Sequence, residues 1–164
     1  MASRVLGVDP SLASTGLALL INGKVILASL ITTSPKCSTA ERLSEIHSSF
    51  AATLAVWAPD IVAFEDQFAG RNMKTLKLLS QVKGVLLMTC AEMKIPIVNY
   101  APTSVKMVIT GRGNASKEDV AAAVIGDCSD HVQCYLSTLK KTDDVTDAIA
   151  IAKTYLATPK EDAV

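Results

Sequence analysis

Several features that mark common classes of protein are scarce in this sequence. Its 16 basic and 16 acidic side chains give a formal net charge of zero, so the chain as a whole has no electrostatic attraction to nucleic acid. The apolar runs fall short of the roughly 18 to 20 residues that a membrane-spanning helix needs. The first residues also lack the apolar block of a signal peptide. These absences favour a cytoplasmic protein over a membrane or secreted one.

The cysteines lack a pattern as well. No C-x-x-C pair occurs among Cys37, Cys90, Cys128 and Cys134. They make no zinc-ligand spacing with the two histidines. Because 49% of the residues are hydrophobic, the chain can build a core without disulfide bonds. We expect reduced thiols and no structural zinc.

The charges that are present are unevenly distributed. Between Gln67 and Lys117 there are eight basic residues and one acid, Glu92, whereas the flanking parts hold fifteen acids and eight bases. Such an asymmetry is expected when one face of a protein meets phosphate groups, although a solvated helix face produces it too. A chain of 164 residues is too short for two ordinary domains. We expect a single domain over residues 1–158 and a frayed tail at residues 159–164.

Hydrophobic periodicity predicts a mixed α/β fold. Strand-like segments at residues 5–8, 17–21 and 24–28 open the chain, and Asn22-Gly23 joins the last two as a strong hairpin signal. Further strands at 61–65 and 96–100 alternate with helices at 39–57, 72–93, 102–110, from 117 onward and at 143–157. We therefore expect a five-stranded mixed sheet, with three antiparallel and then two parallel strands, flanked by helices.

Acidic residues stand where these elements should present core side chains. Asp9 ends the first predicted strand, and Glu65 ends the fourth. Asp144 and Asp147 lie near the start of the last helix. At 100° per residue these two aspartates fall on the same side of that helix, at the edge of its apolar arc. We expect both to face inward.

The neighbouring aspartate is predicted to differ. Asp143 falls on the side of the last helix that carries Thr146 and Ala150, which we expect to be the solvent face. Two inward carboxylates about 4 Å apart repel by roughly 4 kcal/mol at an effective dielectric of 20. Divalent cations offset such repulsion, and oxygen-only ligands favour magnesium or manganese. Two ions about 4 Å apart are suited to an in-line phosphodiester displacement.

The same residues resemble the RuvC family of Holliday junction resolvases, which are RNase H-like nucleases. Residues 8–11 followed by Thr15-Gly16 resemble the family's opening Asp-Pro-(Gly/Ser)…Thr-Gly. Residues 64–68 resemble its second acidic segment, and residues 144–152 resemble its Asp-x-x-Asp-Ala ending. Residues 105–106 and 115–117 match positions where the family carries basic residues. The resemblance covers nearly the whole chain in the right order.

Carried over by position, this resemblance implies an RNase H-like fold and a set of site residues. The implied metal ligands, for two Mg²⁺ or Mn²⁺ ions, are Asp9, Glu65, Asp144 and Asp147, and Lys117 joins them in catalysis. The implied DNA-binding residues are Phe68, Arg71, Lys74, Lys77, Lys106, Arg112 and Lys117. Phe68 would stack on a base, although a core phenylalanine is the ordinary alternative. A homodimer that cuts four-way DNA junctions, leaving 5′-phosphate and 3′-hydroxyl ends, is also implied.

Three departures from the family pattern bear on substrate choice. Ser11 replaces the commoner glycine, Asp66 stands where glutamine is usual, and residues 128–141 form a longer stretch. They leave open the cleavage-sequence preference and the junction selectivity, and they fit a phage-encoded or otherwise divergent member.

Other functions are compatible with parts of the pattern. One is an RNase H-like nuclease acting on RNA–DNA hybrids or linear duplexes, and another is a non-catalytic protein that binds branched DNA. An actin-like nucleotide-binding fold would use Asp9 and Thr15-Gly16 as its phosphate loop, but it normally needs two such halves.

Overall fold

The structure is a computed structural model in which residues 3–66, 72–126 and 128–158 are described. Of the predicted DNA-binding residues, Phe68 and Arg71 lie outside this described part, as does the predicted tail at residues 159–164.

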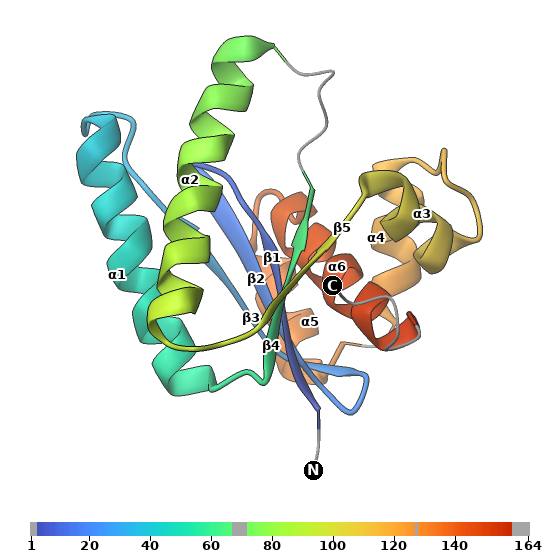
Figure 1. The fold of residues 1–164 in the computed structure, drawn as a ribbon. Coiled ribbons are helices and arrows are strands. Elements are labelled where there is room, and N and C mark those ends of the chain that lie inside the picture. The colour runs from blue at the N-terminus through green and yellow to red at the C-terminus, as the bar shows by residue number, and fades with distance from the viewer. Residues whose placement is uncertain (1–2, 67–71, 127, 159–164) are drawn as a thin grey trace.

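A five-stranded mixed sheet forms the centre of the fold, as predicted (Figure 1). Its strands are β1 (Arg4–Asp9), β2 (Ser14–Ile21), β3 (Lys24–Thr32), β4 (Ile61–Glu65) and β5 (Ile97–Tyr100), in the order β3-β2-β1-β4-β5. The first three pair antiparallel, and β4 pairs parallel with both β1 and β5. Asn22 and Gly23 close the β2–β3 turn with φ values of 52° and 83°, as the hairpin signal predicts.

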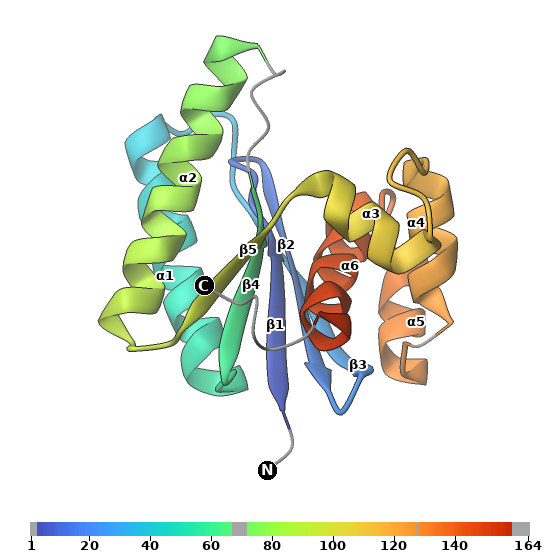
Figure 2. The ribbon, with the colours of Figure 1, turned by 45° about the vertical axis from the view of Figure 1, so that its right-hand side comes forward.

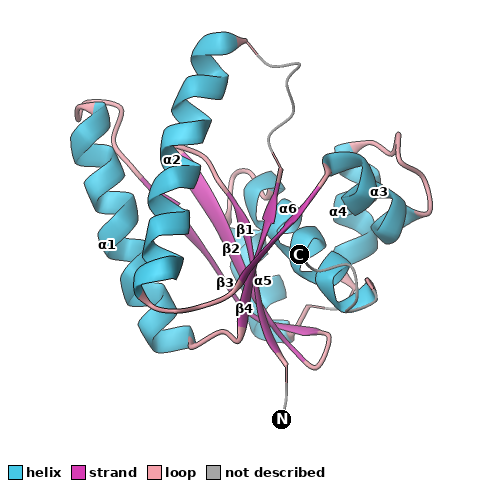
Figure 3. Cartoon of the chain, viewed as in Figure 1, coloured by secondary structure: helices cyan, strands magenta, loops and turns pink. Residues whose placement is uncertain are grey.

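Helices cover both faces of the sheet (Figures 2 and 3). Helices α1 (Thr39–Trp57) and α2 (Met73–Glu92) pack on one face, where Phe50 and Leu86 are fully buried. The other face is covered by α6 (Asp143–Ala157), flanked by α3 (Pro102–Thr110), α4 (Lys117–Ile125) and α5 (Asp130–Thr138).

Helix α6 is buried on nearly every side, which differs from the expectation of a solvent face. Thr146 and Ala150 are only 2% and 1% exposed, because α3 and α4 pack on the side of α6 that turns away from the sheet. On the sheet side, a Cβ at Gly7 would lie 1.9 Å from the Ala148 carbonyl oxygen. The missing side chain therefore lets α6 lie directly against β1.

Helix α5 was not predicted from the sequence, and it explains the long 128–141 stretch. Just before α5, Cys128 forms a bridge with Val25 on the edge strand β3, and the Ser129 amide donates to the Val25 carbonyl at 3.1 Å. This segment covers part of an edge that would otherwise be open to pairing with another chain.

The four cysteines are free thiols in the described residues, and two of them are buried. No helix within the described ranges combines the length and the apolar character needed to cross a membrane.

Candidate active site

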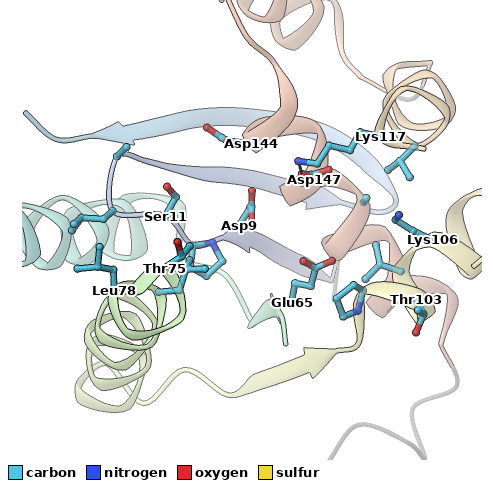
Figure 4. A pocket seen from close by; sticks show the side chains of 18 of the residues that line it. Asp9, Ser11, Glu65, Thr75, Leu78, Thr103, Lys106, Lys117, Asp144 and Asp147 are labelled. Atoms are coloured by element: carbon cyan, nitrogen blue, oxygen red, sulfur yellow. Dashed lines mark hydrogen bonds and ion pairs between the residues drawn. The ribbon is translucent and has the colours of Figure 1, made fainter. Parts of the chain in front are cut away.

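The predicted acids come together at the carboxyl ends of β1 and β4. A pocket of about 720 Å³ opens there, and its walls include Asp9 from β1, Glu65 from β4, and Asp144 and Asp147 from the first turns of α6. Figure 4 shows their carboxylates around a common space, with Asp9 in the middle. Asp143 does not line this pocket. Its carboxylate pairs instead with Lys141 at 3.3 Å.

A glycine makes this arrangement possible. In the β1–β2 ladder Gly16 lies opposite Asp9. A Cβ at Gly16 would lie 1.9 Å from the carbonyl oxygen of Asp144, far inside van der Waals contact. Only the missing side chain allows the first turn of α6 to reach β2 and bring Asp144 next to Asp9. The Thr15-Gly16 pair in the sequence thus has a packing role.

The clustering of acids changes their protonation. Desolvation by burial raises the pKa of Asp9 well above its usual range, and repulsion from Asp147, Glu65 and Asp144 raises it further. Desolvation also raises the pKa of Asp147, against the lowering effect of Lys117. The protein therefore holds carboxyl groups that resist ionisation, as expected where a cation is to bind.

Lys117 is the first residue of α4, and Ser116 caps this helix through a reciprocal bond pair with Asp119. The Lys117 ammonium lies 3.3 Å from Asp147 Oδ2. Desolvation lowers the pKa of Lys117, but attraction from acids led by Asp147 outweighs it and raises the pKa overall. Lys117 is thus a fixed cation on the wall of the pocket, and Lys106 from α3 joins it there.

Helix α2 holds the end of β4 in a way that the sequence did not reveal. The Lys83 ammonium donates to the Glu65 carbonyl and to Asp66 Oδ1, each at 3.1 Å. The Lys83 side chain is only 12% exposed. From the other side, the Asp66 amide donates to the Tyr100 carbonyl at 2.8 Å. Asp66, which stands where the family usually has glutamine, therefore takes part in an ion pair and hydrogen bonds that fix the backbone next to Glu65.

The loop between β1 and β2 forms another wall of the pocket. The buried Thr15 hydroxyl donates to the Ser11 carbonyl at 2.7 Å and accepts from the Ser11 amide at 3.2 Å. Ser11, Leu12 and Ala13 all line the pocket, and so does Arg42 from α1, a cation that no sequence pattern singled out.

Three further predicted DNA-binding residues that the structure describes, Lys74, Lys77 and Arg112, do not line this pocket. Lys74 and Lys77 border a separate open groove on α2, together with Met73 and Leu76. Arg112 lies on the α3–α4 connection and pairs with Asp119 at 3.2 Å, with both side chains largely exposed.

The donor set of the pocket fits hard divalent cations, because all four acids offer carboxylate oxygens. In the part of the chain that the structure describes, no three His, Cys, Asp or Glu side chains are arranged around one metal position. Magnesium nevertheless binds through one or two carboxylates and keeps several waters or substrate oxygens. Four acids spread around one pocket therefore suit divalent cations that keep some waters or substrate oxygens.

Comparisons with known proteins show the family of this chain. The family model described as crossover junction endodeoxyribonuclease RuvC matches residues 5–155. The chain belongs to the RuvC family. The RuvC of Thermomicrobium roseum is 34% identical over 93% of this chain and 91% of its own length. The RuvC of Syntrophomonas wolfei is 36% identical over 93% of this chain and 88% of its own length.

Solved structures of RuvC proteins are similar throughout. A structure described as T. thermophilus RuvC in complex with Holliday junction substrate matches with a TM-score of 0.81 at 28% identity. The match covers 94% of this chain and 93% of that one. The yeast mitochondrial resolvase Ydc2 matches with a TM-score of 0.68 at 17% identity, which supports the shared fold alone. The predicted RNase H-like fold and RuvC resemblance are thus confirmed.

Proposed function

We propose that this chain is a metal-dependent endonuclease that cuts four-way junctions and related branched DNA, with residues 1–158 acting as one nuclease domain. The observation that carries the proposal is the pocket in which acids from β1, β4 and α6 face a common space beside Lys106 and Lys117. Membership of the RuvC family gives the reaction class, because its members are named crossover junction endodeoxyribonucleases.

The acids have a direct role in this reaction. Asp9, Glu65, Asp144 and Asp147 would hold two Mg²⁺ or Mn²⁺ ions through their carboxylate oxygens. Bound ions would supply charge compensation at the attacking and leaving oxygens of the scissile phosphate. Burial and the neighbouring acids disfavour the negative charge of Asp9, so its carboxylate would be stabilised by a bound cation. Products with 5′-phosphate and 3′-hydroxyl ends follow from cleavage on the 3′-oxygen side.

The cations around the pocket would bind the DNA backbone. Lys117 is held near the acids by Asp147, so its charge lies where the phosphate must enter. Lys106 extends this positive wall along α3. Lys74, Lys77 and Arg112 lie farther out and are suited to flanking arms of a branched substrate. Phosphate contacts of this kind give affinity without sequence preference.

We also propose a homodimer, since symmetric cutting of a junction needs two sites. The amino-terminal turns of α2 extend beyond the end of the sheet (Figures 1 and 2). That part of the helix carries the apolar Met73, which is 77% exposed, and Leu76, both bordering an open groove. An apolar surface on a protruding helix is suited to pair with its own copy.

The test is the substitution Asp147→Asn. It keeps the shape of the side chain but removes the charge, so a synthetic four-way junction with magnesium should be cut at least about 100-fold more slowly, while junction binding stays measurable. Asp143→Asn is the matched control, because Asp143 is in the same turn of α6 but outside the pocket. It should cut at nearly the normal rate.

Substrate class is decided by parallel digestions of a junction, a linear duplex and an RNA–DNA hybrid. Preferred cutting of the junction, abolished by a chelator, is the expected result. Preferred cutting of the hybrid would instead identify another RNase H-like nuclease. Full activity of the Asp147→Asn variant would refute the assignment of the acids.

A further inference from the structure

Arg42 is a second kind of cation in the catalytic pocket. It lies in the first turns of α1, on the wall formed by the β1–β2 loop rather than by α3 and α4. Its Nε donates to Thr33 Oγ1 at 2.7 Å, and its Nη2 donates to the Leu12 carbonyl at 3.1 Å. One guanidinium group therefore joins α1, the residue after β3 and the loop that follows Asp9.

The partners of Arg42 are themselves held in place. The Thr33 hydroxyl donates to the Leu12 carbonyl at 2.5 Å, and the Thr33 amide donates to the Ala13 carbonyl at 3.1 Å. Thr33 is only 8% exposed. A guanidinium bound at two such points has lost most of its rotational freedom, so it is set in place before any substrate arrives.

The positive charge of Arg42 stays uncompensated. Both of its acceptors are neutral oxygens, and no carboxylate pairs with it among the residues that the structure describes. Lys117 differs, because Asp147 already partners it. The third nitrogen of Arg42, Nη1, has no hydrogen-bond partner in the described ranges. An unpaired guanidinium on the wall of a pocket that admits DNA matches a phosphodiester group in geometry and charge.

We propose that Arg42 binds a backbone phosphate of the cleaved strand, next to the scissile one and on the side of the pocket away from Lys106 and Lys117. The Thr33 and Leu12 contacts orient the guanidinium for this phosphate. The proposal rests on the proposed nuclease function and extends it with a binding residue on a second wall. The cleaved strand is then held on both sides of the reacting phosphate, which fixes the line of attack.

The test compares Arg42→Gln with Lys24→Gln, which removes the same charge from an exposed residue at the β2–β3 turn, at the far end of the sheet from Asp9. Binding of a labelled four-way junction is measured in chelator over a series of salt concentrations. For Arg42→Gln, the slope of log affinity against log salt should fall by about one, the loss of one phosphate contact. The Lys24→Gln slope should match the wild type.

Two further variants separate charge from orientation. Arg42→Lys keeps the positive charge, so the salt slope should equal that of the wild type. Cleavage at saturating junction should fall about tenfold, because a lysine cannot keep the two contacts that orient the guanidinium. Thr33→Val removes one anchor and should lower cleavage in the same direction with an unchanged slope. If Arg42 and Thr33 served folding alone, these variants would have lower melting temperatures. The salt slope would then not stay constant while the cleavage rate falls.

An Arg42→Gln variant that folds and keeps the wild-type slope would overturn the proposal. If Arg42→Gln fails to fold, the test uses the wild type and Arg42→Lys. Both are measured on DNA in which single phosphates are replaced by neutral methylphosphonates. Neutralising the phosphate next to the cut should weaken binding by the wild type and by Arg42→Lys more than neutralising phosphates farther away does, and equal losses at every position would also overturn the proposal. A wild-type chain that binds no junction at all would refute the proposed function rather than the role of Arg42.

Discussion

At the scale of single residues, Asp9 shows how a binding site conflicts with stability. Its carboxyl group is placed among three other acids and away from water, and both effects raise its pKa well above the usual range. The folded state therefore disfavours the charged form. Stability from this group is greatest at low pH and falls as pH rises through the ordinary carboxyl pKa toward the raised value. Above that raised value the full penalty is present.

The first prediction follows from the raised pKa of Asp9. Asp9→Asn removes the charge with little change of shape, so in a chelator at pH 7 the variant should be more stable than the wild type by about 1 kcal/mol. For a chain of this length that corresponds to roughly 2–4 °C in melting temperature. Thermal unfolding followed by circular dichroism measures the difference, and near pH 3.5 the two curves should approach each other.

The Asp9→Asn variant should also lose junction cutting, so its effect on stability and its effect on activity have opposite signs. Adding magnesium should stabilise the wild type, because the ion binds the folded state alone, and should stabilise Asp9→Asn much less. A variant that is less stable than the wild type in chelator would contradict the sign of the charge effect.

Site residues differ in how far their positions follow from sequence. Asp9, Glu65, Asp144 and Asp147 could be selected because acids at strand ends and on an inward helix side conflict with the local apolar pattern. Arg42 and Lys83 carry no such conflict. Their partners Thr33, Leu12 and Asp66 become neighbours only when α1 and α2 pack on the sheet. Such contacts depend on tertiary structure, and nothing in the local sequence marks them.

At the scale of elements, the site depends on how closely α6 approaches the sheet. Gly7 and Gly16 provide the two points of contact, opposite the carbonyl oxygens of Ala148 and Asp144. Helical periodicity correctly put Asp144 and Asp147 on one side of α6. It gave the wrong environment for Thr146 and Ala150, because periodicity identifies one buried face and α6 is packed between layers. Helix α5 was missed although Val132, Tyr135, Leu136 and Leu139 stand at helical spacing, because this apolar stripe is confined to a helix of nine residues.

The second prediction tests this close approach. Gly16→Ala places a methyl group where the Asp144 carbonyl lies, so α6 must shift away from β2. We expect a loss of about 1–3 kcal/mol in the free energy of unfolding. Cleavage should fall by about 100-fold, because small displacements of catalytic groups have large effects on rate.

Gly84→Ala is the matched control, since a Cβ at Gly84 in α2 meets no atom within 4 Å. That change should stabilise the helix by up to about 1 kcal/mol and leave cleavage unaffected. Urea unfolding and single-turnover cleavage measure the two quantities. A Gly16→Ala protein with normal activity would mean that α6 is not fixed by this contact.

At the scale of the whole molecule, the net charge is zero, although the surface around the pocket is rich in charged side chains. The acids that offset the lysines are partly concentrated inside the pocket, where bound cations would neutralise them. With those ions in place, the surface that meets DNA becomes net positive although the chain is neutral. Composition alone could not reveal this, because it counts buried and exposed charges equally. The uneven distribution of charge along the sequence predicts a basic face, which composition does not.

The third prediction concerns assembly. If the exposed apolar turns of α2 join two copies, Leu76→Glu buries a charge in that interface and should convert a dimer to a monomer of 17.3 kDa. Size-exclusion chromatography with light scattering measures the mass. Val56→Glu is the control, because Val56 on α1 is 77% exposed and outside the proposed interface.

Loss of the dimer should also change the pattern of cutting. In a supercoiled plasmid that extrudes a cruciform, paired cuts within one binding event give linear DNA, whereas independent cuts give nicked circles first. The wild type and Val56→Glu should yield mainly linear product, and Leu76→Glu should yield nicked circles because each monomer carries one pocket. A Leu76→Glu protein that remains dimeric and still makes paired cuts would show that the two copies meet elsewhere.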